Sequence, residues 1–221
     1  MNVSITTKSR NQAFATDIID WWNVYGREFP WRRTDDPFKV LIAEILLQRS
    51  RSGSVAKVIT DLFQTWPSAK ELADANLPEL ENMISPLGLK SRASRLKVLA
   101  RSWSELRTLP RNAQDLRNLP GVGPYSANAT ATAMLWDSGP CVDSVSIRVM
   151  RRFRGNHTKR QSDQRIASIT YSGVPKDRWR ELNWAILDLS AELCMPRVPR
   201  CLDCPLSEQC KWAQNHRQKP I

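Results

Sequence analysis

Four cysteines near the C-terminal end have the residue type and spacing to bind one metal centre. They follow the pattern C-x6-C-x2-C-x5-C: Cys194, Cys201, Cys204 and Cys210. Thiolate sulfur is a ligand that favours iron–sulfur clusters or zinc. A structural zinc site usually joins two C-x2-C pairs across a hairpin, whereas this segment has one such pair in a compact loop. The spacing therefore favours a [4Fe–4S] cluster, with zinc and with free or disulfide-bonded thiols as the alternatives.

A glycine-rich segment, Leu119-Pro-Gly-Val-Gly-Pro-Tyr-Ser-Ala127, precedes an apolar helix expected over Ala127–Trp136. Glycines two positions apart permit a tight turn and leave backbone amides uncovered. Exposed amides at a helix N-terminus bind phosphate groups. In a basic chain this pattern predicts a helix-hairpin-helix motif that binds the DNA backbone through Gly121, Gly123 and Ser126. A plain hairpin of two helices with a glycine turn is the alternative.

Two acidic residues stand at positions suited to chemistry. Asp143 precedes the helical pattern Ser144–Phe153, where an aspartate commonly caps the helix. Glu44 lies in an otherwise apolar helix, and a buried carboxylate there would be costly without a purpose. Burial would raise its pKa and suit it to proton transfer. The alternative for Glu44 is a helix-face glutamate paired with Gln48 or Arg51.

The elements that must position these residues are helices. Apolar residues recur at helical spacing, proline and glycine mark the breaks, and strand signals are scarce. The expected helices are Ala13–Tyr25, Val40–Gln48, Val55–Trp66, Leu72–Ala75, Leu80–Ile84, Ala93–Leu106, Ala113–Arg117, Ala127–Trp136 and Ser144–Phe153. The sequence thus predicts an all-α, two-lobed protein. We expect a central lobe of residues 29–134 with the hairpin at about 113–134, and a terminal lobe of residues 1–28 plus 135–221 with the cysteine loop at 194–210.

The chain is strongly basic. Its formal net charge is +11, and a [4Fe–4S] core with four thiolates would add about −2. Such a surface attracts polyanions, and counterion release makes nucleic acid the leading partner. No apolar run approaches the length of a membrane span, and Met1–Arg10 lacks the apolar core of a secretory signal. We therefore expect a cytoplasmic, nucleoid-associated monomer in a reducing compartment, with no membrane partner.

The hairpin, the following Val142-Asp143 and the cysteine spacing together resemble the endonuclease III/MutY branch of the helix-hairpin-helix GPD superfamily of DNA glycosylases. Pro30-Trp-Arg32, Leu41-Ile-Ala-Glu-Ile-Leu-Leu-Gln48 and Leu87-Gly-Leu89 match as well. The resemblance runs from about residue 21 to residue 212. It implies a helical glycosylase fold with a [4Fe–4S] loop, a monovalent cation at the hairpin, and double-stranded DNA with a mismatched base as the partner.

The resemblance also implies roles for three side chains. The aspartate that matches Asp143 stabilises positive charge on the sugar and helps to activate water. The matching Glu44 protonates adenine in MutY-like enzymes and contacts the pyrimidine in the thymine type. Tyr125 stands where bifunctional members have lysine, and a phenol cannot form a Schiff base. A tyrosine here resembles the thymine/uracil mismatch glycosylases and predicts monofunctional hydrolysis, although simple packing is an alternative and Lys90 could give trace strand cleavage.

Further residues are expected to contact DNA. At the family position of Gln48 and Arg49, side chains fill the gap that a flipped base leaves. Leu89 is the expected second wedge, since apolar side chains can enter a base step. The cations that follow are expected either to hold phosphates or to form a solvated helix face: Lys90, Arg92 and Arg95. We expect the cysteine loop to be structural and to present Arg197, Arg200 and Lys211 to DNA.

The leading hypothesis is a monofunctional DNA glycosylase of base excision repair that removes thymine or uracil opposite guanine. An adenine glycosylase acting on A·G or A·8-oxoG is the rival within the same class, although we expect no second domain of the MutY kind after the cysteine loop. A non-catalytic iron–sulfur protein that binds DNA or senses redox state is the rival outside it, and a zinc-ribbon binding protein is a further one. Retention of both Glu44 and Asp143 argues against an inactive protein.

Overall fold

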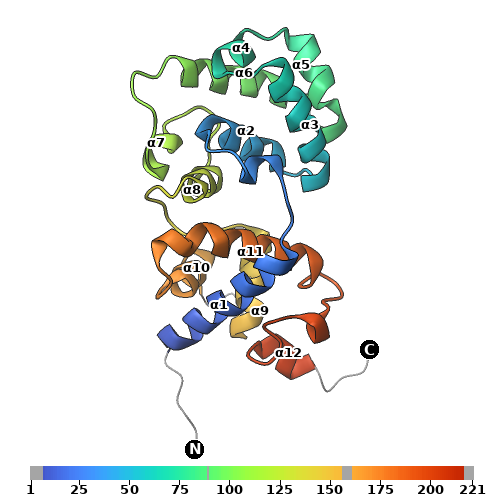
Figure 1. Ribbon diagram of the computed structural model, residues 1–221, viewed down its shortest axis with the longest axis vertical. Coiled ribbons are helices and arrows are strands. Elements are labelled where there is room, and N and C mark those ends of the chain that lie inside the picture. Colours follow the sequence, from blue (N-terminus) through green and yellow to red (C-terminus); the bar gives the residue numbers. More distant parts are fainter. Residues whose placement is uncertain (1–6, 89, 156–160, 217–221) are drawn as a thin grey trace, which may run out of the picture. The chain divides into compact units, whose positions relative to one another are not determined.

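A computed structural model describes residues 7–88, 90–155 and 161–216, and these form α-helices joined by turns and short loops (Figure 1). Within these ranges no strand forms, and an isolated parallel bridge joins Asn112 to Asp137. The predicted all-α fold is confirmed. The helices are α1 (Thr7–Tyr25), η1 (Pro30–Arg32), α2 (Pro37–Leu47), α3 (Ser52–Thr65), α4 (Ala69–Asp74), α5 (Leu77–Ile84), η2 (Ser85–Leu87), α6 (Arg92–Ser104), α7 (Ala113–Arg117), α8 (Pro124–Ala133), α9 (Ser144–Arg154), α10 (Asp163–Tyr171), η3 (Lys176–Arg178), α11 (Trp179–Glu192), η4 (Cys201–Asp203) and α12 (Lys211–His216), where η marks a 3-10 turn.

The chain divides into two compact units. The terminal unit comprises Met1–Arg27 with Pro140–Ile221, and the central unit comprises Glu28–Gly139. Each unit has a hydrophobic core of its own, built from the buried faces of its helices. Among the described residues no helix is both long and apolar enough to span a membrane.

The central unit is built around α2. In Figure 1 this helix runs through the middle of the unit, with α3 on one side and α8 on the other. The helix is apolar on nearly all sides, as expected for one enclosed by its neighbours, and every residue from Val40 to Leu46 is buried. Asp36 caps its start by accepting hydrogen bonds from the amides of Phe38 and Lys39. Burial of the helix body leaves its C-terminal turn, at Gln48, at the surface.

The terminal unit brings together segments from the two ends of the chain. α1 packs against α11, which lies far from it in the sequence (Figure 1). The fully buried Asp188 of α11 fixes the end of α1. Its carboxylate accepts hydrogen bonds from Trp22 Nε1 at 3.0 Å and from the Arg27 backbone amide at 2.9 Å, and it forms an ion pair with the Arg27 guanidinium at 2.8 Å. One buried acid therefore holds the last turn of α1 and the residues that follow it.

Several helix boundaries differ from the prediction because capping decides them. α8 begins at Pro124 rather than Ala127, since Gly123 is the N-cap and Pro124 takes the first helical position. α4 is a complete short helix because Ser68 and Glu71 form a reciprocal capping box. α1 begins at Thr7, earlier than the apolar pattern indicates. Apolar spacing locates the buried face of a helix, whereas its ends depend on local hydrogen bonds.

Candidate active site and nucleic-acid interface

The hairpin between α7 and α8 presents an open backbone surface. Gly121 has φ +77, in the left-handed region that favours glycine, and Gly123 has φ −84 and caps α8. A Cβ added at either glycine would meet no protein atom within 4 Å. The first amide with an acceptor inside α8 is that of Ala127, which donates to the Gly123 carbonyl at 3.0 Å. The amides of Gly123 and Ser126 come before it and have no acceptor within the helix. The turn can therefore accept a phosphate group at close range.

Replacement of Gly123 by alanine tests this surface. Its φ is accessible to any residue and the methyl group meets no protein atom, so Gly123→Ala is expected to fold with an unchanged melting temperature. The methyl group projects from an open turn and would hold a phosphate away from the amides. We expect the affinity for duplex DNA to fall about tenfold, measured by fluorescence anisotropy. Gly53→Ala is the matched control, because its Cβ also meets nothing within 4 Å but it lies on α3. Equal DNA affinity of the two variants would contradict a phosphate cradle at the hairpin.

The first turn of α8 is linked to the end of α2. Gln48 Nε2 donates to the hydroxyl of Ser126 at 3.2 Å, and Ser126 is buried. The Ser126 side chain therefore has a partner inside the protein, and the predicted DNA contact of this residue would come from its backbone amide. Tyr125 is half-buried in the same turn of α8. Glu44 is 8% exposed, so the predicted burial of this carboxylate on α2 is confirmed.

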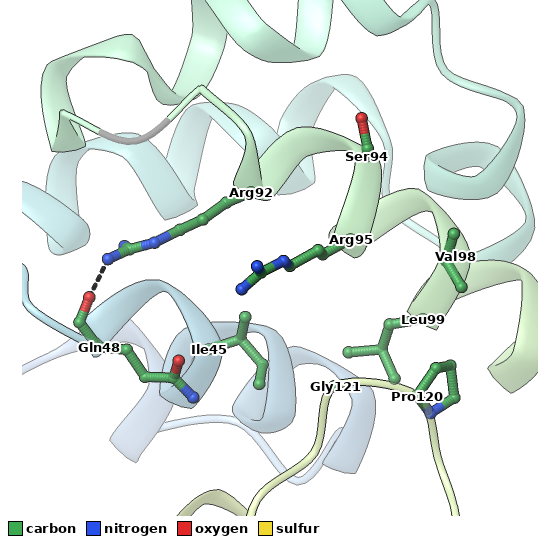
Figure 2. A pocket seen from close by; sticks show the side chains of 9 residues that line it. All are labelled: Ile45, Gln48, Arg92, Ser94, Arg95, Val98, Leu99, Pro120 and Gly121. Carbon is green, nitrogen blue, oxygen red and sulfur yellow. Dashed lines mark hydrogen bonds between the residues drawn. The ribbon is translucent and has the colours of Figure 1, made fainter.

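A pocket of about 370 Å³ opens between the end of α2, the outer face of α6 and the hairpin (Figure 2). Its lining residues are Ile45, Gln48, Arg92, Ser94, Arg95, Val98, Leu99, Pro120 and Gly121. Figure 2 shows the guanidinium of Arg95 reaching into the space between α6 and α2, above Ile45. The side chain of Arg92 instead extends toward the backbone of Gln48, to which a dashed line joins it. The pocket thus has an apolar floor with cationic and amide groups at its edge.

The predicted phosphate contact of Arg92 is wrong. Its side chain is buried, and its guanidinium donates to protein oxygens at the end of α2. The neighbouring Arg95 and Lys90 are exposed, as a phosphate contact requires. Leu89, the predicted second wedge, lies outside the described residues. Gln48 and Arg49 are both exposed on the turn after α2, where a contact with DNA is accessible.

Asp143 caps α9 in the terminal unit. Its Oδ1 accepts a hydrogen bond from the Ser146 amide at 2.6 Å, and Ser146 Oγ accepts one from the Asp143 amide at 3.1 Å. This reciprocal arrangement is a capping box and confirms the capping role expected from the local sequence. It also fixes the carboxylate at the positive end of a helix, where negative charge is favoured. Asp143 is half-buried, so it is held in place without being sealed from solvent.

Two residues that the sequence did not point out lie near Asp143. Tyr171, at the end of α10, is fully buried; burial raises the pKa of its phenol well above the ordinary value, and Cys141 and Asp143 add to this shift. Arg148 donates to the carbonyls of Ser190 and Cys194 at 3.1 and 3.0 Å. Burial lowers the pKa of Arg148, whereas Cys194 and Asp143 raise it. No local signal could have identified either residue, because both depend on packing between distant helices.

The four C-terminal cysteines line one small cavity together with Arg152 and Trp212. None of them forms a disulfide. Burial, together with a smaller effect of the other three thiols, raises the pKa of Cys204 to about 12. Within the described ranges no three His, Cys, Asp or Glu side chains stand close enough to hold a single metal ion.

Arg152 connects this loop to α9. Its guanidinium donates to the sulfur of Cys194 at 3.4 Å and to the carbonyl of Met195 at 2.7 Å, and it stacks over the Trp212 ring at 4.9 Å. The guanidinium of Arg200 forms an exposed ion pair with Asp203 at 2.9 Å, and its expected contact with DNA stays a prediction. The last turns of α9 and the short α12 therefore hold the cysteine loop.

These features define a class of protein. A glycine hairpin opens onto a helix N-terminus beside an exposed Gln-Arg turn in the central unit, and the terminal unit carries a helix-capping aspartate and a four-cysteine loop. This is a helical DNA-binding protein of the helix-hairpin-helix class. The chain belongs to the HhH-GPD superfamily of base excision DNA repair proteins, whose family model matches residues 42–174.

Proteins of similar sequence and fold match nearly the whole chain. The chain is 34% identical over 217 residues to a thymine-DNA glycosylase of Aeropyrum pernix, a match that covers 94% of this chain and 97% of the relative. It is 31% identical over 211 residues to a thymine/uracil-DNA glycosylase of Methanothermobacter thermautotrophicus, with 93% and 96% covered. A solved structure described as a thermostable thymine-DNA glycosylase superposes with a TM-score of 0.86 at 31% identity, covering 95% of this chain and 99% of that one. The predicted glycosylase family is confirmed.

Proposed function

We propose that this protein is a monofunctional DNA glycosylase that removes thymine or uracil mispaired with guanine in double-stranded DNA. The observation that carries the proposal is Tyr125 in the first turn of α8, directly after the hairpin. A phenol in this place cannot attack the sugar to give a Schiff base, as a lysine amine would. Water is then the nucleophile, and the product is an abasic site in an unbroken strand. The choice of thymine and uracil is supported by the similarity to thymine and thymine/uracil glycosylases.

Each candidate residue has a role in the proposed reaction. The hairpin amides bind a phosphate of the duplex, and the target nucleotide leaves the base stack. Gln48 and Arg49 fill the gap, while Glu44 forms a hydrogen bond to the extruded pyrimidine. As the N-glycosidic bond breaks, the base departs with the bonding electrons and the sugar becomes positively charged. The Asp143 carboxylate stabilises that charge, water adds to the sugar carbon, and the proton that the water gives up neutralises the departed base anion.

The four cysteines are proposed to hold a [4Fe–4S] cluster. Four thiols that share one cavity fit the donor set of such a cluster. Burial opposes ionisation of Cys204, so a cationic iron centre would supply the charge that thiolate ligands require. The cluster would order the loop between α11 and α12.

Analysis of the purified protein should give about four iron and four sulfide per chain. Cys204→Ala should lose the iron, and Cys141→Ala, in the same unit, should keep it. Zinc in place of iron would contradict the assignment.

A panel of labelled duplexes tests the proposed activity. The substrates are T·G, U·G, A·G, A·8-oxoG and an oxidised pyrimidine opposite guanine, each incubated with and without alkali. We expect excision from T·G and U·G, with strand breaks that appear after alkali. Excision of adenine alone would replace the proposed substrate, and absence of excision from every duplex would overturn the enzymatic function. Gel filtration with and without a T·G duplex tests the expected monomer in the same preparation.

A further inference from the structure

The turn after α2 contains a backbone conformation that is costly for its residue. α2 ends at Leu47, and two residues later Arg49 has φ +59, in the left-handed region. A residue with a side chain is disfavoured there, because its Cβ approaches the following carbonyl oxygen. Such a conformation persists where the surroundings hold it in place. The turn carries Gln48 and Arg49, both exposed, so its shape decides where these two side chains point.

Arg92 supplies the contacts that hold this turn. Its guanidinium, from the first residue of α6, donates to the carbonyl of Leu46 at 2.9 Å and to the hydroxyl of Ser50 at 2.9 Å. It also donates to the carbonyl of Gln48 (Figure 2). The acceptors lie on both sides of Arg49. The last carbonyls of a helix have no partner within it, and a planar guanidinium can serve several at once in fixed directions.

Arg92 is a buried cation, and its surroundings disfavour a positive charge. The residue is 6% exposed, and among the described residues no acid forms an ion pair with it. Burial lowers the pKa of Arg92, and the nearby Arg49 and Arg95 lower it further. A buried cation beside two like charges is costly unless its hydrogen bonds are complete. The approach of DNA phosphates would reduce this repulsion, so binding of a polyanion and the shape of the turn are coupled.

We propose that Arg92 is a positioning residue for mispair recognition: it locks the Gln48–Arg49 turn in the conformation that presents both side chains to the duplex. The inference rests on the proposed function, because it assigns the turn to reading a mispair. Gln48 is held from the other side by its hydrogen bond to Ser126. Arg92 therefore fixes the backbone of Gln48, and the hairpin helix fixes its side-chain amide.

Arg92→Lys is the sharpest test, with Arg95→Lys as the matched control. An ammonium keeps the charge but lacks the planar fork that bridges the carbonyls and the hydroxyl. Arg95 lines the same pocket, and its side chain is exposed. In the full protein, Arg92→Lys is expected to leave the affinity for matched duplex within about twofold of wild type. Its preference for a T·G over a matched duplex should fall about tenfold, and single-turnover excision about 10²-fold. Arg95→Lys, at an exposed candidate phosphate contact, is expected to change the affinity for mispaired and matched duplex alike and so to keep the preference.

Ser50→Ala is a second variant that tests the inference if Arg92→Lys fails to fold. It removes one acceptor of Arg92 and leaves the cation, so we expect a smaller loss of mispair preference with an unchanged melting temperature. Arg92→Lys indistinguishable from Arg95→Lys in both readouts would overturn the inference. So would an unfolded Arg92→Lys together with a wild-type Ser50→Ala. If the wild-type protein excises neither thymine nor uracil, the proposed function is contradicted instead. Arg92 is then tested by comparing how strongly the variants and the wild-type protein prefer the mispair that the wild-type protein binds.

Discussion

Asp143→Asn is expected to lower the single-turnover rate of base excision on the order of 10³-fold while leaving mispair affinity within about twofold of wild type. Asparagine caps a helix about as well as aspartate, so the hydrogen bond to the Ser146 amide and the start of α9 are kept. The change removes the negative charge that stabilises the developing cation on the sugar. The measurement is quench-flow or manual single-turnover excision from a T·G duplex, with affinity from anisotropy.

Asp36→Asn is the matched control for this variant. Asp36 also caps a helix, accepting hydrogen bonds from two amides at the start of α2, but its charge takes no part in the proposed reaction. We expect its excision rate and melting temperature to stay close to wild type. Comparable rate losses in the two variants would show that the effect of Asp143→Asn comes from helix capping and not from catalysis.

Asp188→Asn is expected to lower the free energy of unfolding by about 3 kcal/mol. The carboxylate is 0% exposed and pairs with Arg27, whose side chain is 29% exposed. An amide there removes the charge and turns one acceptor into a donor that faces N–H groups, which leaves a buried donor unsatisfied. For the temperature of half-unfolding this corresponds to a decrease of roughly 10 °C, measured by circular dichroism.

Glu192→Gln provides the comparison on the same cation. Glu192 lies 3.9 Å from the Arg27 guanidinium and is 51% exposed. Because exposed ion pairs contribute about 0–1 kcal/mol, this variant should melt within a few degrees of wild type. If Asp188→Asn is no less stable than Glu192→Gln, the buried ion pair does not hold the end of α1 as the structure indicates.

The sequence predicts those parts of the site whose function depends on residue type and local spacing. The hairpin needs Gly121 because the turn requires a positive φ, and the capping role of Asp143 follows from its place before a helix. Glu44 is an acid within an apolar helix, and the structure confirms that it is buried. In these cases the feature depends on residues that are close together in the sequence.

Features that depend on contacts between distant segments could not be predicted in this way. Arg92 stands in a run of cations that the sequence presents as a solvated or phosphate-binding face, yet its partners are carbonyls more than forty positions upstream. Tyr171 ends a helix for which no pattern was identified, and its position beside Asp143 depends on the packing of α9 and α10. The placement of a side chain relative to another helix is a property of the assembled core.

The most direct test of the account is the fate of a T·G duplex incubated with the wild-type protein in the presence of sodium borohydride. Hydrolysis with Tyr125 in the first turn of α8 predicts release of free thymine and no covalent adduct between protein and DNA when borohydride is present. A parallel incubation without borohydride should leave an intact strand that alkali then cleaves. Borohydride reduces a Schiff base to a stable bond, so an attacking amine would be trapped. A trapped adduct formed at the rate of thymine release would contradict the monofunctional mechanism. A duplex that keeps its thymine while adenine is released from A·G would contradict the proposed substrate.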